Sequence, residues 1–118
     1  MDNGITAIAE AAYAKEIGID MVITDHHQPL ASIPEAVAVI NPQISPDYEF
    51  KEICGATVAF KLIAGLTTRL ITDPKKKQEI FNFFMPIVAI ATVADCMPLV
   101  NENRLLVKTG LDLMNRRK

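Results

Sequence analysis

The alternation of apolar and polar residues divides the chain into an α/β front part and an all-α rear part. Apolar side chains recur every three or four positions over residues 5–17, which predicts a helix whose apolar stripe includes Ala9 and Ala12. Gly18 can end this helix in left-handed geometry. Two short runs near residues 21–24 and 36–40 are rich in β-branched residues and predict buried strands. A helix leading into a strand is half of a βαβ unit, so we predict a small parallel sheet flanked by helices.

The rear part carries only the three-to-four-residue spacing that is typical of helices. Such patterns cover residues 56–71, 74–84 and 87–94, and a last amphipathic pattern runs over 101–114. Pro86 separates the second pattern from the third. Because proline lacks the N–H that a helix interior needs, we predict two separate helices there.

Composition indicates a folded domain. Half of the 118 residues are hydrophobic and 22% are charged, which is enough to bury a core within one domain. The longest apolar run, residues 85–94, is shorter than the ~20 residues that cross a bilayer, so no membrane partner is expected. A net charge of -2 argues against a domain that holds nucleic acid by charge alone.

The cysteines and the first residues bear on cellular context. Cys54 and Cys96 are far apart and form no CxxC pair, so we predict neither a disulfide framework nor a zinc knuckle. This usage fits a reducing compartment, and no signal-peptide pattern is present, so we expect a cytoplasmic protein. Polar residues 2–4 precede the first helix with no strand before them, and we therefore expect a piece of a longer chain.

Candidate chemistry gathers where the first predicted strand ends. Asp25, His26 and His27 follow that strand directly, and in open parallel sheets ligands bind at the carboxyl ends of the strands. Asp2 would lie at the same edge if another strand preceded it, because parallel strands lie ~4.8 Å apart. A carboxylate and an imidazole could then converge on one ion.

Asp95 is a further candidate because it follows "PIVAIATVA", the most apolar stretch of the chain. A carboxylate buried there would need a metal ion, an arginine or several backbone donors as its partner. Aspartates combined with histidine suit Mn²⁺ or Mg²⁺.

Each of these residues also has a plainer interpretation. Adjacent histidines after a strand are typical of a polar turn, Asp2 could cap the first helix, and Asp95 could end a helix bonded to a loop. In a continuing strand the rings of His26 and His27 would point to opposite faces. Only a turn at His26 lets both rings face one pocket.

Four stretches in order carry a resemblance to a known family. They are "DNGI" at 2–5, "VITDHH" at 22–27, "CGATVAFKL" at 54–62 and "ATVADCMPLVNENR" at 91–104. Together they resemble the DHH phosphoesterase family, and the last stretch resembles its RecJ branch of single-strand-specific exonucleases. The resemblance covers nearly the whole chain, so residues 1–118 are expected to form a single, partial DHH domain.

The resemblance implies a two-ion site for Mn²⁺ or Mg²⁺ and specific roles for the candidates. Asp2 would bridge the ions, while His26 and Asp95 would ligate one of them. His27 would face the scissile phosphate, and Asp25 would either ligate an ion or hold His26. The implied reaction is metal-assisted hydrolysis of single-stranded DNA from the 5′ end to mononucleotides.

The chain also departs from the family pattern. The family's first, aspartate-rich motif and its C-terminal DHHA1 domain have no counterpart here, so we expect a fragment that is inactive by itself. The resemblance leaves two alternatives open. One is a phosphodiesterase for short oligonucleotides or cyclic dinucleotides, and the other is a non-catalytic scaffold of the same fold among replication or repair proteins.

Overall fold

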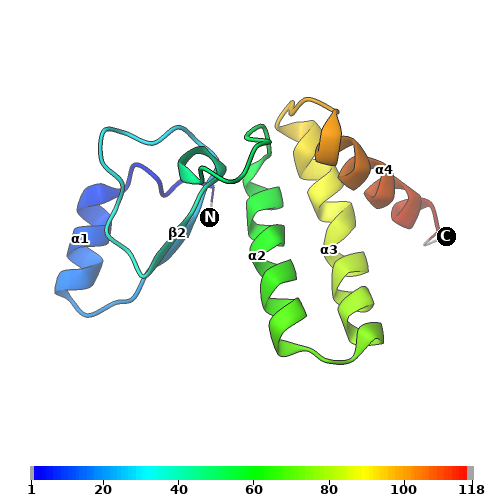
Figure 1. Cartoon of the computed structure of the whole chain (residues 1–118), viewed down its shortest axis with the longest axis horizontal. Coiled ribbons are helices and arrows are strands. Elements are labelled where there is room, and N and C mark those ends of the chain that lie inside the picture. The colour runs from blue at the N-terminus through cyan, green and yellow to red at the C-terminus, as the bar shows by residue number, and fades with distance from the viewer. Residues whose placement is uncertain (1, 117–118) are drawn as a thin grey trace. The chain divides into compact units, whose positions relative to one another are not determined.

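The computed structural model describes residues 2–116, and its elements follow the predicted order. The chain divides into two compact units, Met1–Lys51 and Glu52–Lys118. The first holds α1 (Ile8–Glu16), β1 (Val22–Thr24), β2 (Ala38–Ile40) and the short 3₁₀ helix η1 (Pro42–Ile44), and the second holds α2 (Gly55–Leu70), α3 (Pro74–Ala94) and α4 (Asn101–Arg116) (Figure 1). The predicted α/β part followed by an all-α segment is confirmed.

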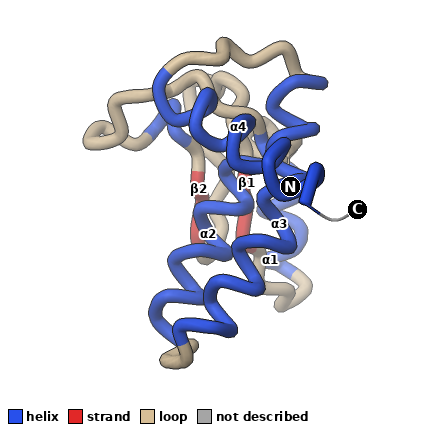
Figure 2. Tube along the Cα trace, turned by 90° about the vertical axis from the view of Figure 1, so that its right-hand side faces the viewer, coloured by secondary structure: helices blue, strands red, loops and turns tan. Residues whose placement is uncertain are grey.

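The two strands form the predicted parallel sheet. β1 pairs with β2 in the register Val22 with Ala38 and Thr24 with Ile40 (Figure 2). Both strands are shorter than the runs at 21–24 and 36–40 predicted, although Val37 N donates to Met21 O and extends the pairing by one bond. Parallel strands need a connection of roughly a dozen residues or more, and the irregular segment between Thr24 and Ala38 supplies it without a helix.

Helix α1 begins later than the predicted start at residue 5. The N–H groups of Gly4 and Ile5 donate to the side chain of Asp25, and Ile5 is buried ahead of the helix. The predicted stripe was therefore counted from a residue outside the helix, and its alanines at positions 9 and 12 are exposed. Ala11 and Ala14 form the buried face instead.

The end of α1 agrees with the prediction. Gly18 has a φ of 75°, its N–H donates to Lys15 O, and the N–H of Ile19 donates to Ala14 O. These two bonds satisfy carbonyls of the last turn in the pattern known as a Schellman motif, which requires left-handed geometry at the glycine position. The turn leads the chain from α1 towards β1.

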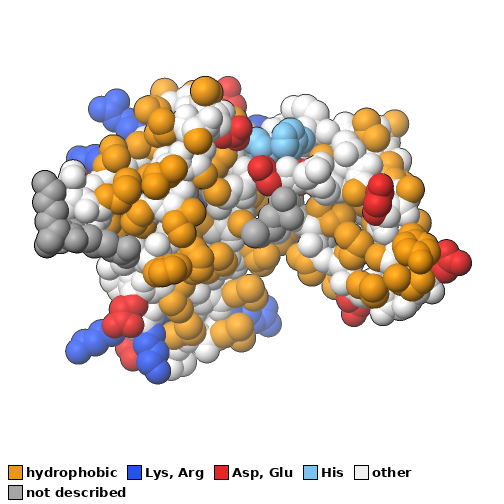
Figure 3. Space-filling view, turned by 180° about the vertical axis from the view of Figure 1, so that it is seen from behind, with side chains coloured by type: hydrophobic (Ala, Val, Ile, Leu, Met, Phe, Trp, Pro, Cys, Tyr) orange, Lys and Arg blue, Asp and Glu red, His pale blue; other side chains and the backbone are white. Residues whose placement is uncertain are grey.

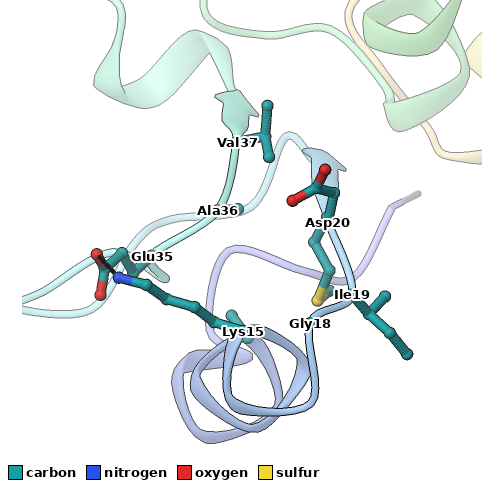
Figure 4. Close-up of a pocket in the computed structure, with 9 residues that line it drawn as sticks. Lys15, Gly18, Ile19, Asp20, Glu35, Ala36 and Val37 are labelled. Carbon is teal, nitrogen blue, oxygen red and sulfur yellow. Dashed lines mark hydrogen bonds and ion pairs between the residues drawn. The ribbon is translucent and has the colours of Figure 1, made fainter.

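A cavity of about 290 Å³ lies beside this turn, at the amino ends of the strands. It is lined by residues of α1, by the segment 18–21 and by the segment 35–37. Lys15 and Glu35 point towards each other and form an ion pair at its side (Figure 4). The cavity is therefore at the opposite ends of the strands from Asp25.

In the second unit, α3 is one helix, so the predicted break at Pro86 is wrong. The physical reason lies in its packing against α4. A side-chain carbon added at Gly110 of α4 would come within 2.7 Å of Met85 O and 2.4 Å of Ala89 Cβ, so the two helices nearly touch next to the proline. Pro86, Val88 and Ala89 are buried, and this packing outweighs the one missing hydrogen bond.

Two further observations bear on cellular context. Cys54 is buried and Cys96 is exposed, and both are free thiols, as the sequence predicts. Within residues 2–116, none of the helices combines the length and the apolar character that crossing a bilayer requires.

Candidate metal centre

The carboxyl end of β1 gathers four side chains that can ligate a metal ion. Asp2, Asp25, His26 and His27 each offer one ligand atom, and these atoms all lie within 4.8 Å of one another. The backbone brings them together, since Asp2 N donates to Thr24 O at 2.8 Å and Asp25 N donates to the last residue of β2. Figure 3 shows the histidines at the surface of the first unit with acidic side chains beside them. The convergence expected at this edge is present.

Asp25 is the buried centre of the cluster, with 1% of its surface exposed. Its Oδ2 accepts from Gly4 N at 2.7 Å and from Ile5 N at 2.9 Å. Its Oδ1 accepts from His26 N at 2.7 Å, from His27 N at 3.3 Å and from His27 Nδ1 at 2.7 Å. Oδ2 thus accepts N–H groups from the start of the chain, and Oδ1 accepts N–H groups from the two histidines.

These hydrogen bonds fix the charge of the Asp25 carboxylate. Burial alone raises the pKa of Asp25, because a charged group is costly away from water. The bonds from Ile5 N, the His27 ring, Gly4 N and His27 N outweigh burial, and the net effect is a pKa well below the ordinary value. The bonds therefore favour the charged form of Asp25, and its carboxylate ties residues 4 and 5 to the histidine turn.

The His27 ring is held at Nδ1 by the Asp25 carboxylate and is more than half exposed. Nδ1 lies 2.7 Å from Asp25 Oδ1, and 58% of the side chain is exposed. Because the Asp25 carboxylate can only accept, Nδ1 is the nitrogen that donates in this pair. The resemblance implied that Asp25 either ligates an ion or holds His26, whereas the structure places its carboxylate on the His27 ring and on the backbone N–H of His26.

The His26 ring lies beside the carboxylate of Asp2. Its Nε2 lies 3.1 Å from Asp2 Oδ1, with side-chain exposures of 11% for His26 and 59% for Asp2. Two neighbouring ligands of one six-coordinate ion, each bonded at about 2.1 Å, lie roughly 3.0 Å apart. The two atoms are therefore spaced like neighbouring ligands of one small divalent ion.

Backbone geometry turns the rings towards a common region. Asp25 accepts from the N–H groups of both following residues, which bends the chain at His26 instead of continuing the strand. The ring centroids of His26 and His27 lie 4.3 Å apart and tilted by 58°. The turn at His26 that both rings need in order to face one pocket is therefore present.

Asp95, the remaining predicted ligand, belongs to the second unit. It is the C-cap of α3, and its backbone N–H donates to Ala91 O. Its side chain is exposed, so the expected burial behind the apolar stretch is not found. Its assignment as a metal ligand stays a prediction.

Three residues that contribute to this site carry no signal that local patterns reveal. Gly4 lies so close to β1 that an added side-chain carbon would be 2.6 Å from Ile23 Cγ2. Asn41 donates to the carbonyl of His27, and Gln43 donates to the carbonyl of His26. The sequence offered two hints: Gly4 lies in the "DNGI" stretch, and the Asn-Pro pair at the end of the second strand signals a turn and no more.

Comparisons with known proteins agree with this geometry. Residues 1–92 match the family described as "DHH family, N-terminal domain". The single-stranded-DNA-specific exonuclease RecJ of Bacillus subtilis (strain 168) is 40% identical over 117 residues, which cover 98% of this chain and 14% of that protein. RecJ of Escherichia coli (strain K12) is 36% identical over 94% of this chain and 20% of its own length.

Solved structures give the same result. RecJ in complex with Mn²⁺ from Thermus thermophilus superimposes with a TM-score of 0.79 and 38% identity, covering 94% of this chain and 16% of that one. A crystal structure of exonuclease RecJ bound to manganese has the same TM-score and identity, with 27% of its chain covered. The chain spans only 14% to 20% of these curated relatives' lengths. With most of its residues matching the family model, the chain belongs to the DHH family.

Proposed function

We propose that this chain is part of a divalent-metal-dependent exonuclease that hydrolyses single-stranded DNA from the 5′ end. The observation that carries the proposal is the convergence of Asp2, Asp25, His26 and His27 within 4.8 Å at one sheet edge. The relatives named single-stranded-DNA-specific exonucleases, and the structures named as manganese-bound, support the substrate class and the ion. Mn²⁺ is the preferred ion, with Mg²⁺ as the alternative.

The geometry supports separate roles for the acidic and histidine side chains. Asp2 and His26 would hold one ion between Oδ1 and Nε2, and the second oxygen of Asp2 makes it the candidate to bridge to another. Asp95 stays the further ligand that the family resemblance implies. When bound, the ions supply an activated water and neutralise charge that develops on the phosphate.

His27 is proposed to contact the scissile phosphate. Asp25 holds the ring at Nδ1 and sets its orientation, and an imidazole that carries both protons could donate from Nε2 to a phosphate oxygen. Asp25 would act through His27 and through the turn, because its oxygens already accept five N–H groups. In this proposal His26 is a metal ligand and His27 is a phosphate contact.

The parent enzyme is proposed to add further ligands. A two-ion site of six-coordinate metals needs more donors than Asp2, His26 and Asp95 can provide. We therefore expect the 118-residue chain alone to be inactive or nearly so. Its two free thiols suit a reducing compartment, and we place the parent in the cytoplasm alongside DNA repair or replication proteins.

The test uses the full-length parent with substitutions in this segment. Release of mononucleotides from 5′-labelled single-stranded DNA in Mn²⁺ should fall about 100-fold or more in Asp2→Asn and in His26→Ala. Each removes an interaction worth several kcal/mol, and about 1.36 kcal/mol corresponds to tenfold in rate. Asp47→Asn, which alters an exposed carboxylate in the same unit, is the control and should keep full activity.

Three outcomes would contradict parts of this proposal. Unchanged activity of His26→Ala would remove the metal role. Faster turnover of dinucleotides or cyclic dinucleotides than of long single strands would favour a small-substrate phosphodiesterase. Robust nuclease activity of the isolated chain would overturn its assignment as an incomplete site.

A further inference from the structure

The histidine turn is held from two sides, and only one of them involves Asp25. Asp25 accepts the backbone N–H groups of His26 and His27. The two carbonyls of the same residues face the segment that follows β2. There Asn41 Nδ2 donates to His27 O at 2.9 Å, and Gln43 Nε2 donates to His26 O at 3.3 Å.

Asn41 is placed for this contact by the sheet register. Thr24 pairs with Ile40, so Asn41 and Asp25 are the first residues beyond the paired strands. Asn41 is 1% exposed and Asp25 N donates to Ile40 O at 3.0 Å. The buried side chains of Asp25 and Asn41 thus lie at the carboxyl ends of neighbouring strands. Asp25 binds the N–H groups of the histidine turn, and Asn41 binds a carbonyl of the same turn.

Both ends of the Asn41 side chain are occupied, which fixes its orientation. Oδ1 accepts from Gln43 N at 2.8 Å, as the N-cap of η1, and Nδ2 is then the atom that reaches His27. Capping alone would need only the oxygen, which serine or aspartate supplies equally well. The amide nitrogen is the part of the side chain that serves the histidine turn.

Gln43 extends the same link. Its Nε2 also lies 3.3 Å from Lys51 O, and its Oε1 accepts from Gln28 Nε2 at 3.1 Å. Capping by Asn41 sets the start of η1 and therefore where Gln43 projects. One buried asparagine thereby controls the contacts to both histidine carbonyls.

We propose that Asn41, assisted by Gln43, is a positioning residue that sets the directions of the His26 and His27 rings. It touches neither ion nor phosphate in this assignment, and it acts through the carbonyls of the turn. The consequence for catalysis rests on the proposed function, but the positioning itself does not. Loss of the Nδ2 bond should free the His27 carbonyl and let the ring leave Asp25 Oδ1.

The test exploits the fact that the chain has only two histidines. Asn41→Ser keeps an N-cap oxygen for Gln43 N and is too short to reach His27 O. In ¹⁵N-edited NMR of the imidazoles without metal, wild type should show a protected His27 Nδ1–H, and Asn41→Ser should lose it and shift both rings. Gln43→Met, at a less buried position, should shift His26 more than His27.

Ser45→Ala is the matched control, because Ser45 Oγ donates to the carbonyl of Asn41 and is not bonded to either histidine. Ring signals in Asn41→Ser and Gln43→Met that match those of Ser45→Ala would overturn the proposal. If Asn41→Ser does not fold, Gln43→Met alone decides by the same criterion.

A Mn²⁺ titration separates this proposal from the proposed function. In the full-length parent, Asn41→Ser should weaken Mn²⁺ binding about 10-fold to 100-fold, as loss of partners behind metal ligands typically does. Altered rings in Asn41→Ser together with no Mn²⁺ binding by the wild-type parent would keep the positioning role and reject the metal function. Unaltered rings in Asn41→Ser together with Mn²⁺ binding by the wild-type parent would keep the metal function and reject the positioning role.

Discussion

Replacement of Asp25 by asparagine tests whether this side chain is an anchor of the fold as well as part of the candidate site. The amide group keeps the size of the carboxylate but turns one acceptor oxygen into a donor. In one orientation its NH₂ would face Gly4 N and Ile5 N, and in the other it would face His26 N. Every orientation leaves buried N–H groups without an acceptor.

The magnitude follows from those lost acceptors. With the NH₂ at the Oδ2 position, two N–H groups are left unsatisfied, each at about 1–3 kcal/mol, and the remaining bonds lose their charge assistance. Removing a buried charge relieves some desolvation cost and offsets part of this loss. We therefore expect Asp25→Asn to lower the free energy of unfolding of the first unit by about 2–5 kcal/mol.

The assay can report on the first unit selectively. Tyr13 and Tyr48, the two tyrosines of the chain, both lie there, and the chain has no tryptophan. Urea unfolding followed by tyrosine fluorescence should show a midpoint lowered by about 2 M or more, at a slope of about 1 kcal/mol per M. Asp47→Asn makes the same chemical change at an exposed position and should stay within about 0.5 kcal/mol of wild type. An Asp25→Asn midpoint that matches the Asp47→Asn midpoint would refute the anchor role.

Two further predictions concern the second unit. Gly110→Ala should destabilise it by about 1–3 kcal/mol, because the new carbon would lie 2.7 Å from Met85 O, whereas Gly65→Ala in open space on α2 should stabilise it by roughly 0.5–1 kcal/mol. Shifts of the same sign in urea unfolding followed by circular dichroism would contradict this packing argument. The Lys61–Glu102 ion pair is close, at 2.7 Å between Nζ and Oε2, yet burial lowers the pKa of Lys61 and raises the pKa of Glu102. We expect a double-mutant cycle with Lys61→Met and Glu102→Gln to give a coupling below about 1 kcal/mol. Folding raises the pKa of Glu102, so the protonated side chain contributes to stability at acid pH. This contribution is lost as pH rises above about 4, so wild type should lose stability relative to Glu102→Gln over that range.

Local patterns in the sequence were sufficient for the strands and the edge at which the site lies. β-branched runs gave both strands, and the rule that parallel strands present ligands at their carboxyl ends placed Asp25, His26 and His27 correctly. The glycine at the end of α1 also behaved as its missing side chain predicts. These features depend on neighbours within a few residues of each other.

Contacts between distant segments explain the features that the sequence did not reveal. The start of α1 moved because Gly4 and Ile5 donate to a side chain about twenty residues away. α3 continues through Pro86 because Gly110 lets α4 pack closely beside it. In both cases a partner far along the chain outweighs a local preference.

The same reasoning changes how the Asp-His-His triplet should be understood. The resemblance implied different roles for the three residues and left open whether Asp25 is itself a ligand, and burial bears on that choice. Asp25 is 1% exposed with both oxygens occupied, whereas the His27 side chain is 58% exposed and His26 lies beside Asp2. A buried anion with a depressed pKa is well suited to hold N–H groups and poorly suited to leave them for a metal ion. Asp25→Asn should therefore reduce stability and metal binding together. His26→Ala should reduce metal binding with little loss of stability, since its Asp2 contact is largely exposed on the aspartate side.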